Sequence, residues 1–147
     1  MKKIFIFIGG FLLITIILIS IFFYIQINKP YTEGIDRNWS IKLPNSYKEI
    51  YSKESEASFH GDGERYHVFE YTNEEDINQS VDWENNKDKS VETEINKVLS
   101  TLNVPKENMP NFQSNYKYYT SKDKDSSKIY LIFFTDTKKL YVIEDIF

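Results

Sequence analysis

The chain of 147 residues contains no cysteine. It therefore forms no disulfide, has no thiol nucleophile and offers no site for the acylation of a lipoprotein. The patterns G-x-S-x-G and H-E-x-x-H and a phosphate-binding loop are also missing. These absences remove the recognisable signatures of serine hydrolases, zinc proteases and nucleotide-binding enzymes, so the sequence predicts no enzyme.

Basic clusters are missing as well. All 22 acidic residues lie in residues 28–147, together with only 16 of the 18 basic ones, which gives this part a formal charge of about −6. A protein that binds nucleic acid needs a basic surface to neutralise phosphates. We therefore expect no nucleic-acid partner, and a small cation, a basic peptide or another protein suits this surface better.

Charge is absent from Ile4–Ile27, directly after Lys2 and Lys3. A helix of that length reaches about 36 Å, which exceeds the roughly 30 Å of a hydrocarbon core. The alternative is a cleaved signal peptide, but no alanine precedes Ala57, so a small-x-small cleavage site is lacking. The favoured prediction is an uncleaved transmembrane signal-anchor helix over residues 1–27.

This anchor predicts a single-pass protein of the cell membrane, in contact with lipid through residues 4–27. Lys2 and Lys3 place the amino terminus in the cytoplasm, because positive charge stays on the cytoplasmic side. Residues 28–38, with Pro30 and Gly34, are expected to be a tether. Residues 39–147 then form one extracytoplasmic domain.

The clearest helix signal lies between Ser90 and Leu102. Its apolar residues follow helical spacing on one face: Val91, Ile95, Val98, Leu99 and Leu102. Ser90 is the expected N-cap, and Asn103 and Pro105 end the helix.

Strand signals occupy much of the remaining chain. Alternation in residues 39–44 and extended character in residues 46–52 predict strands near the start of the domain. The last third predicts a meander over residues 115–120, 128–135 and 140–147, with residues 129–134 buried on both faces.

These elements predict an α+β fold, with a small antiparallel sheet and one main helix packed on one face. The opposite face is rich in aromatic residues. Either loops and a short helix cover it, or it is an exposed patch for a partner.

Both histidines lie in SFHGDGERYHVFEY, residues 58–71, which predicts a hairpin around Asp62-Gly63. A two-residue loop pairs His60 with Arg65 and places His60 and His67 on one face. A three-residue loop that includes Gly61 places the histidines on opposite faces. The sequence favours the first register.

Three interpretations of this hairpin remain open. A zinc site lacks its third and fourth ligands, and Arg65 beside His60 opposes a cation. The plainest interpretation is a tight turn with its histidine and arginine at a wet rim. The third is a recognition loop formed by His60, Asp62, Arg65 and His67. We predict no metal, no cofactor and no catalytic residue.

The stretches SIKLP (Ser40–Pro44) and FHGDGERYHVFEY (Phe59–Tyr71) follow a short lysine-led apolar segment. In this they resemble small exported proteins of low-GC Gram-positive bacteria, membrane-anchored or of the lipoprotein type, which share an L-P element and an H-G-D-G hairpin. The chain departs from the lipoproteins because the acylated cysteine is missing. The resemblance implies an exported location and brings no activity with it.

The leading hypothesis for function is a membrane-anchored domain that binds a protein or peptide without catalysis, of the immunity, exclusion or envelope-accessory type. The first alternative is a small-ligand or cation sensor that uses the His60–Gly63 turn. The second is a hydrolase of envelope material. A concave pocket beside the hairpin, a flat aromatic face or two convergent carboxylates would distinguish the three.

Overall fold

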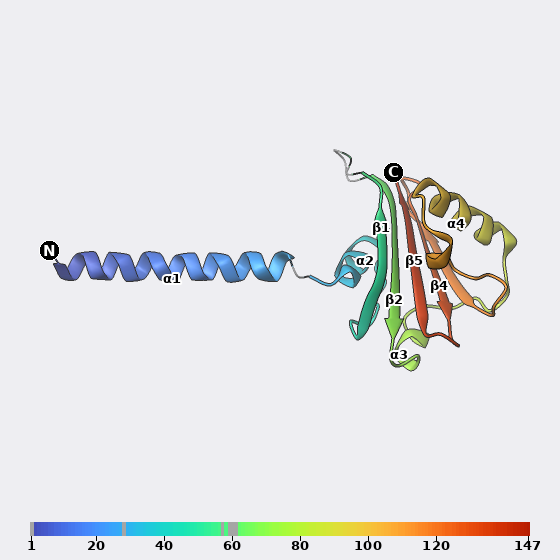
Figure 1. Cartoon of the computed structure of the whole chain (residues 1–147), viewed down its shortest axis with the longest axis horizontal. Helices are drawn as coiled ribbons and strands as arrows, with labels where there is room; N and C mark the ends of the chain where they lie inside the picture. The colour runs from blue at the N-terminus through green and yellow to red at the C-terminus, as the bar shows by residue number, and fades with distance from the viewer. Residues whose placement is uncertain (1, 28, 57, 59–61) are drawn as a thin grey trace.

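The computed structural model describes residues 2–27, 29–56, 58 and 62–147, and the side chains of α1 only for residues 10–25 and 27. Figure 1 shows a long helix that projects away from a sheet domain. In chain order the elements are α1 (Lys2–Ile27), α2 (Tyr31–Trp39), β1 (Tyr47–Glu54), β2 (Gly63–Tyr71), α3 (Glu75–Asn78), α4 (Lys89–Thr101), the 3-10 turn η1 (Lys106–Asn108), β3 (Lys117–Lys122), β4 (Lys128–Phe134) and β5 (Lys139–Ile146).

The five strands form one sheet in the order β1-β2-β5-β4-β3, and all neighbours are antiparallel. The C-terminal meander is confirmed, since β3, β4 and β5 pair in succession. The chain then places β5 beside β2, which brings the last strand to the middle of the sheet. The α+β class and the antiparallel sheet are therefore as expected.

Helix α4 covers one face of the sheet. Its buried residues Ile95, Val98 and Leu99 lie in one core cluster with residues of β2, β4 and β5. The apolar stripe predicted from the sequence is thus the stripe that packs. Asp88 caps the helix and accepts hydrogen bonds from the backbone N–H groups of Ser90 and Val91. The predicted cap at Ser90 is wrong by two residues, because a carboxylate was available just upstream.

The opposite face is covered by α2, by residues 41–43 and by α3. Ile35, Ile41, Leu43 and Ile77 are buried in a second core cluster against β2, β4 and β5. Part of the expected tether is therefore a helix packed on the sheet. Residues 40–44 form no strand, although Ile41 and Leu43 point inward as their alternation predicted.

Helix α2 forms because Tyr31, Ile35 and Trp39 recur at helical spacing and share one face. Pro30 precedes the helix with an extended backbone, and Ser40 ends it in the left-handed conformation at φ 56. Pro30 and Gly34 made this segment look like a linker. The three-residue stripe was the signal that a helix buries one face here.

Burial on both faces decides between the two interpretations of the aromatic residues. Tyr66, Phe69, Tyr71, Tyr116, Tyr130, Phe133 and Phe134 are all buried. Among the described residues outside α1, the exposed large apolar side chains are Ile50 and Phe147. The interpretation in which other segments cover the aromatics is confirmed, and a flat aromatic face for a partner is wrong.

Both expected hairpin registers are wrong. Arg65 pairs with Glu54 and His67 pairs with Ser52, so the connection between the strands is much longer than two or three residues. His60 and Gly61 lie outside the described residues. The register follows the packing of two half-buried tyrosines. The ring centroid of Tyr47 lies 4.2 Å from that of Phe69, and that of Tyr51 lies 5.7 Å from that of Tyr66. Side-chain packing therefore overrode the turn signal.

The glycine of the Asp62-Gly63 pair has a different role from the one expected. Gly63 begins β2 with φ 134, and an added Cβ would lie 2.1 Å from the Ser55 hydroxyl oxygen. That hydroxyl accepts a hydrogen bond from the Glu64 N–H at 3.1 Å. The positive φ favours glycine at this position, and an added Cβ would also displace the Ser55 hydroxyl.

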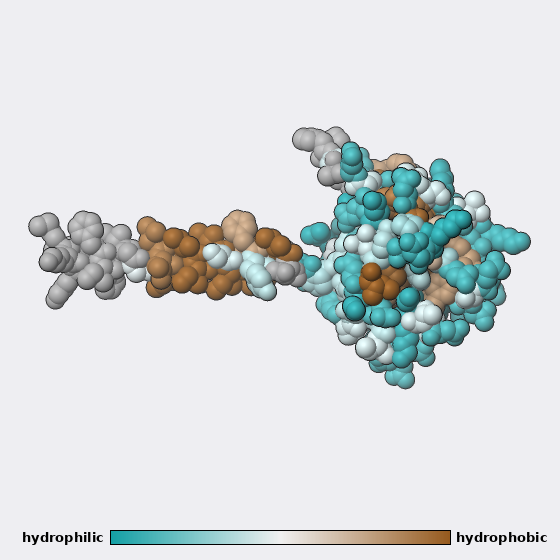
Figure 2. Space-filling view, viewed as in Figure 1, coloured by the Kyte–Doolittle hydropathy of each residue, from teal (hydrophilic) through white to brown (hydrophobic). Residues whose placement is uncertain are grey.

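The expected membrane anchor is not supported. Over the described part of the chain, no helix combines the length and the apolar character that crossing a membrane requires. Figure 2 shows that the described side chains of α1, residues 10–25 and 27, are mostly hydrophobic. The absence of a spanning helix from the described residues contradicts the transmembrane signal anchor, the single-pass topology and the membrane localisation inferred from them.

The cap of α4 gives the first prediction. Asp88→Ala is expected to lower the free energy of unfolding by about 1 kcal/mol, because two N–H groups at the helix start lose their acceptor. Urea denaturation followed by circular dichroism measures this.

Ser90→Ala is the matched control, and we expect a change within about 0.5 kcal/mol, the usual range for a surface substitution. Equal losses in the two variants would show that Asp88 does not act as the cap.

Candidate functional site

Three charged side chains, those of Glu54, Arg65 and Glu144, form a row across one end of the sheet, beneath α2. We call this row the ladder. Glu54 on β1 pairs with Arg65 on β2, and Arg65 pairs with Glu144 on β5. Paired residues on neighbouring strands point to the same face. The next rung on that face carries His67, between Ser52 and Val142. One end of the sheet thus presents alternating charge toward the helix.

Glu144 is a buried carboxylate, with 1% of its surface exposed. Its Oε2 accepts a hydrogen bond from the Tyr31 hydroxyl, and its Oε1 accepts one from Trp39 Nε1 at 2.6 Å. Both donors belong to α2, at its first and last residues. A buried carboxylate needs hydrogen bonds to offset the loss of water, so Glu144 holds both ends of α2 on the sheet.

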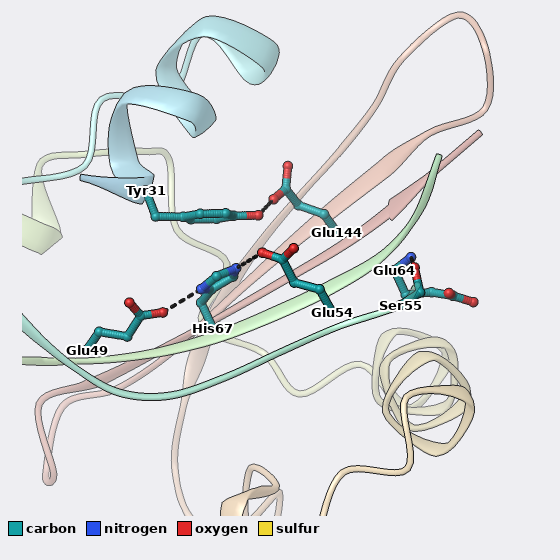
Figure 3. A network of polar contacts seen from close by, with 7 residues as sticks. All are labelled: Tyr31, Glu49, Glu54, Ser55, Glu64, His67 and Glu144. Atoms are coloured by element: carbon teal, nitrogen blue, oxygen red, sulfur yellow. Dashed lines mark hydrogen bonds and ion pairs between the residues drawn. The ribbon is translucent and has the colours of Figure 1, made fainter. Parts of the chain in front are cut away.

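Tyr31 also covers the histidine. Its ring stacks on the His67 ring with centroids 3.5 Å apart and an interplanar angle of 28°, as Figure 3 shows. Burial, followed by the charge and hydrogen bond of Glu144, raises the pKa of the Tyr31 phenol. The hydroxyl therefore stays protonated and keeps donating to Glu144.

His67 is 4% exposed and lies between two carboxylates of β1 (Figure 3). Its Nδ1 lies 2.6 Å from Glu49 Oε1, a hydrogen bond. Its Nε2 lies 3.3 Å from Glu54 Oε1, but the alignment is poor and Nε2 has no hydrogen-bond partner. A neutral imidazole donates from one nitrogen only, so the contact with Glu54 is attractive only when Nε2 also carries a proton.

A bulge in β1 explains how two carboxylates reach one histidine. The register shifts between Glu49 and Tyr51, so that Glu49, Ser52 and Glu54 share a face. In a regular strand Glu49 and Glu54 would point to opposite faces, because side chains alternate. The bulge therefore aims both carboxylates at His67.

A cavity of about 840 Å³ opens beside this ladder. We call it the α2 cavity. Its wall contains three residues of the ladder and residues along one side of α2, with charges of both signs. The lining residues are Lys29, Pro30, Tyr31, Glu33, Gly34, Asp36, Arg37, Asn38, Glu54, Arg65 and Glu144.

Of the four residues singled out in the sequence, the structure brings two together, Arg65 and His67, on one face of β2. His60 lies outside the described part of the chain, and Asp62 is exposed and does not line the α2 cavity. Arg65 does line it, and His67 lies beneath Tyr31 instead of at a wet rim. Sequence reasoning missed Tyr31, Glu54 and Glu144. Glu144 carried a signal, as a charged residue inside an otherwise apolar strand.

Among residues 29–56, 58 and 62–147, no group of three or more potential ligands is placed to hold a metal ion. The two carboxylates beside His67 contact opposite nitrogens of the ring, so they do not converge on one ion.

A second cavity, of about 380 Å³, lies on the other face, near the carboxyl terminus. Lys128 Nζ lies 2.7 Å from Glu94 Oε2, and the Tyr130 hydroxyl donates to the same oxygen. These two hydrogen bonds lower the pKa of Glu94. Desolvation, followed by the nearby charge of Glu64, raises the pKa of Asp145. Each shift has a structural cause, and the cluster serves to attach α4 to the sheet.

Comparison with protein-family models, with curated proteins and with solved structures finds no match. No family is therefore assigned, the resemblance to exported proteins stays an expectation, and function is argued from geometry alone.

The Glu144 network gives the second prediction. Tyr31→Phe removes the donor to Glu144 Oε2 and leaves a buried carboxylate oxygen unsatisfied. We expect the free energy of unfolding to fall by about 1–3 kcal/mol. Tyr119→Phe, which removes a half-buried hydroxyl with no side-chain hydrogen bond among the described residues, is the control and should be nearly neutral. Comparable losses in both variants would contradict the special role of Tyr31.

The lowered pKa of Glu94 gives a pH prediction. A carboxyl group whose pKa is lower in the folded state stabilises the fold above its unfolded pKa, and this contribution is lost on acidification. Lys128→Met should therefore be less stable than the wild type at pH 7, with a difference that shrinks below about pH 4. Lys128 also lowers the pKa of Asp145, so the substitution removes a stabilising charge from this carboxyl group as well. A difference in melting temperature that is constant from pH 7 to pH 3 would refute this assignment.

Proposed function

We propose that this chain is a non-catalytic binding domain for a peptide or for a segment of a partner protein, which it holds in the α2 cavity. The observation that carries the proposal is the volume of about 840 Å³ next to a rigid polar network. Ligand sites usually measure about 300–1,000 Å³ and are formed before the ligand arrives. The Glu144 hydrogen bonds give α2, one wall of the cavity, such a fixed position.

The chemistry of the wall supports a peptide as ligand. Seven of the lining residues carry charge, three basic and four acidic, and Asn38 adds an amide. Sites for drug-like molecules are lined mainly by apolar and aromatic side chains. A peptide offers backbone amides and charged side chains, which match a wall with charges of both signs.

The surroundings of the buried polar groups support binding without catalysis. His67 is buried, its ring nitrogens face Glu49 and Glu54, and it does not line the α2 cavity, so it is not placed to act as a base on a ligand held there. Both oxygens of Glu144 accept hydrogen bonds from groups of α2. The alternative site, the turn at His60–Gly63, includes residues outside the described part and has no comparable support.

Gly34 allows a direct test of the proposal. It lines the α2 cavity, and an added Cβ meets no atom within 4 Å. Gly34→Trp should therefore fill the cavity while the helix stays intact, because any other residue except proline favours a helix more than glycine does. Asn96→Trp, at an exposed position of α4, is the matched control.

The experiment selects heptapeptides from a random-sequence phage library on the full wild-type chain, in a nonionic detergent that shields the exposed apolar residues of α1. Synthetic copies are then measured by fluorescence polarisation. We expect Gly34→Trp to lower their affinity at least about tenfold and Asn96→Trp to leave it unchanged. The proposal fails if no sequence is enriched, or if the enriched peptides bind the Gly34→Trp variant as well as the wild type.

A further inference from the structure

The inner end of the α2 cavity has more negative than positive charge. On the face that carries the ladder, Glu54 and Glu144 flank a single guanidinium, that of Arg65. The hydrogen bonds that Glu144 receives come from Tyr31 and Trp39, which are uncharged donors and do not cancel its charge. Among the described side chains of this face, one cation therefore lies beside two carboxylates at this end of the sheet.

The opposite wall, which α2 supplies, adds a third carboxylate. Lys29 and Glu33 form an ion pair at 3.7 Å and balance each other. Asp36 is half-buried, lines the cavity and has no side-chain hydrogen bond or ion pair within the described structure. The remaining positive group on this wall, Arg37, is exposed. Negative charge is thus more buried than positive charge along α2 as well.

Glu54 is the carboxylate best placed to take a ligand. Its side chain is 53% exposed and lines the cavity, so a bound group can reach it. Its contact with His67 Nε2 lacks hydrogen-bond alignment, and this buried nitrogen is left without a partner. By contrast Glu49, on the other side of His67, is engaged in a hydrogen bond of 2.6 Å. Glu54 is therefore available to accept hydrogen bonds from the cavity.

We infer that the α2 cavity binds a cationic side chain of the peptide, a lysine ammonium or an arginine guanidinium, between Glu54 on the sheet and Asp36 on α2. This inference rests on the proposed function and names the chemistry of its ligand. A cation carries donors for both carboxylates and supplies the positive charge that the inner end lacks. The formal charge of about −6 on residues 28–147 attracts such a ligand from a distance.

The test uses two fluorescent probes, acetylated and amidated pentalysine and pentaglutamate, with the full-length chain. We expect pentalysine to bind and pentaglutamate not to bind. Glu54→Gln should weaken pentalysine binding by about fivefold or more, since it removes charge and keeps the shape. Glu56→Gln removes the same charge from an exposed residue that does not line the cavity, and should change the affinity by less than about twofold.

Asp36→Asn is a second variant, because Asp36 has no partner whose loss would unfold the protein. It too should weaken pentalysine binding, and Gly34→Trp should abolish it. Equal effects of Glu54→Gln and Glu56→Gln would show attraction to the surface in general and overturn the inference.

Failure of the inference is distinguishable from failure of the proposed function. If library-selected peptides bind in a manner that depends on Gly34 but pentalysine does not compete with them, the cavity binds peptides and the cationic ligand is wrong. If Gly34→Trp changes the affinity neither for the library-selected peptides nor for pentalysine, both the proposed function and the inference of a cationic ligand are wrong.

Discussion

One buried carboxylate forms the polar attachment between α2 and the sheet, beside the apolar packing of Ile35. Glu144 lies in the central strand β5, and its two oxygens bind the first and last residues of α2. A buried carboxylate that has neither water nor hydrogen-bond donors lowers the stability of the fold. The two donors on α2 therefore stabilise Glu144 at this position. The position of α2 in turn creates the wall of the cavity and places the Tyr31 ring over His67.

The second constraint is the bulge in β1. It turns Glu54 to the face that carries Glu49, and both carboxylates then lie beside one imidazole. Bulges often re-aim a side chain near a functional site. Here the consequence is a histidine with one aligned and one unaligned carboxylate, and the unaligned one, Glu54, is accessible from the cavity. Local backbone irregularity and the buried network thus combine to form the acidic end of the cavity.

The sequence predicted those helices and strands in which apolar residues recur at a regular spacing. The stripe from Val91 to Leu102 predicted α4, and the runs in the last third predicted β3, β4 and β5. The segment of α2 was missed because Pro30 and Gly34 outweighed a stripe of only three residues. Of the candidate site, Arg65 and His67 were named, but their neighbours were not, because Glu54 and Glu144 are separated from them by the hairpin connection and by most of the chain.

The sequence by itself determined the absence of thiol chemistry, the acidic character of residues 28–147, the main helix and the C-terminal meander. Composition and short-range periodicity are local properties, and local reasoning is sufficient for them. Only the tertiary structure decided the strand register, the burial of His67 and the meeting of Tyr31 with Glu144. These depend on which side chains pack together across long separations, and the packing of Tyr47 on Phe69 and of Tyr51 on Tyr66 prevailed over the strong turn signal at Asp62-Gly63.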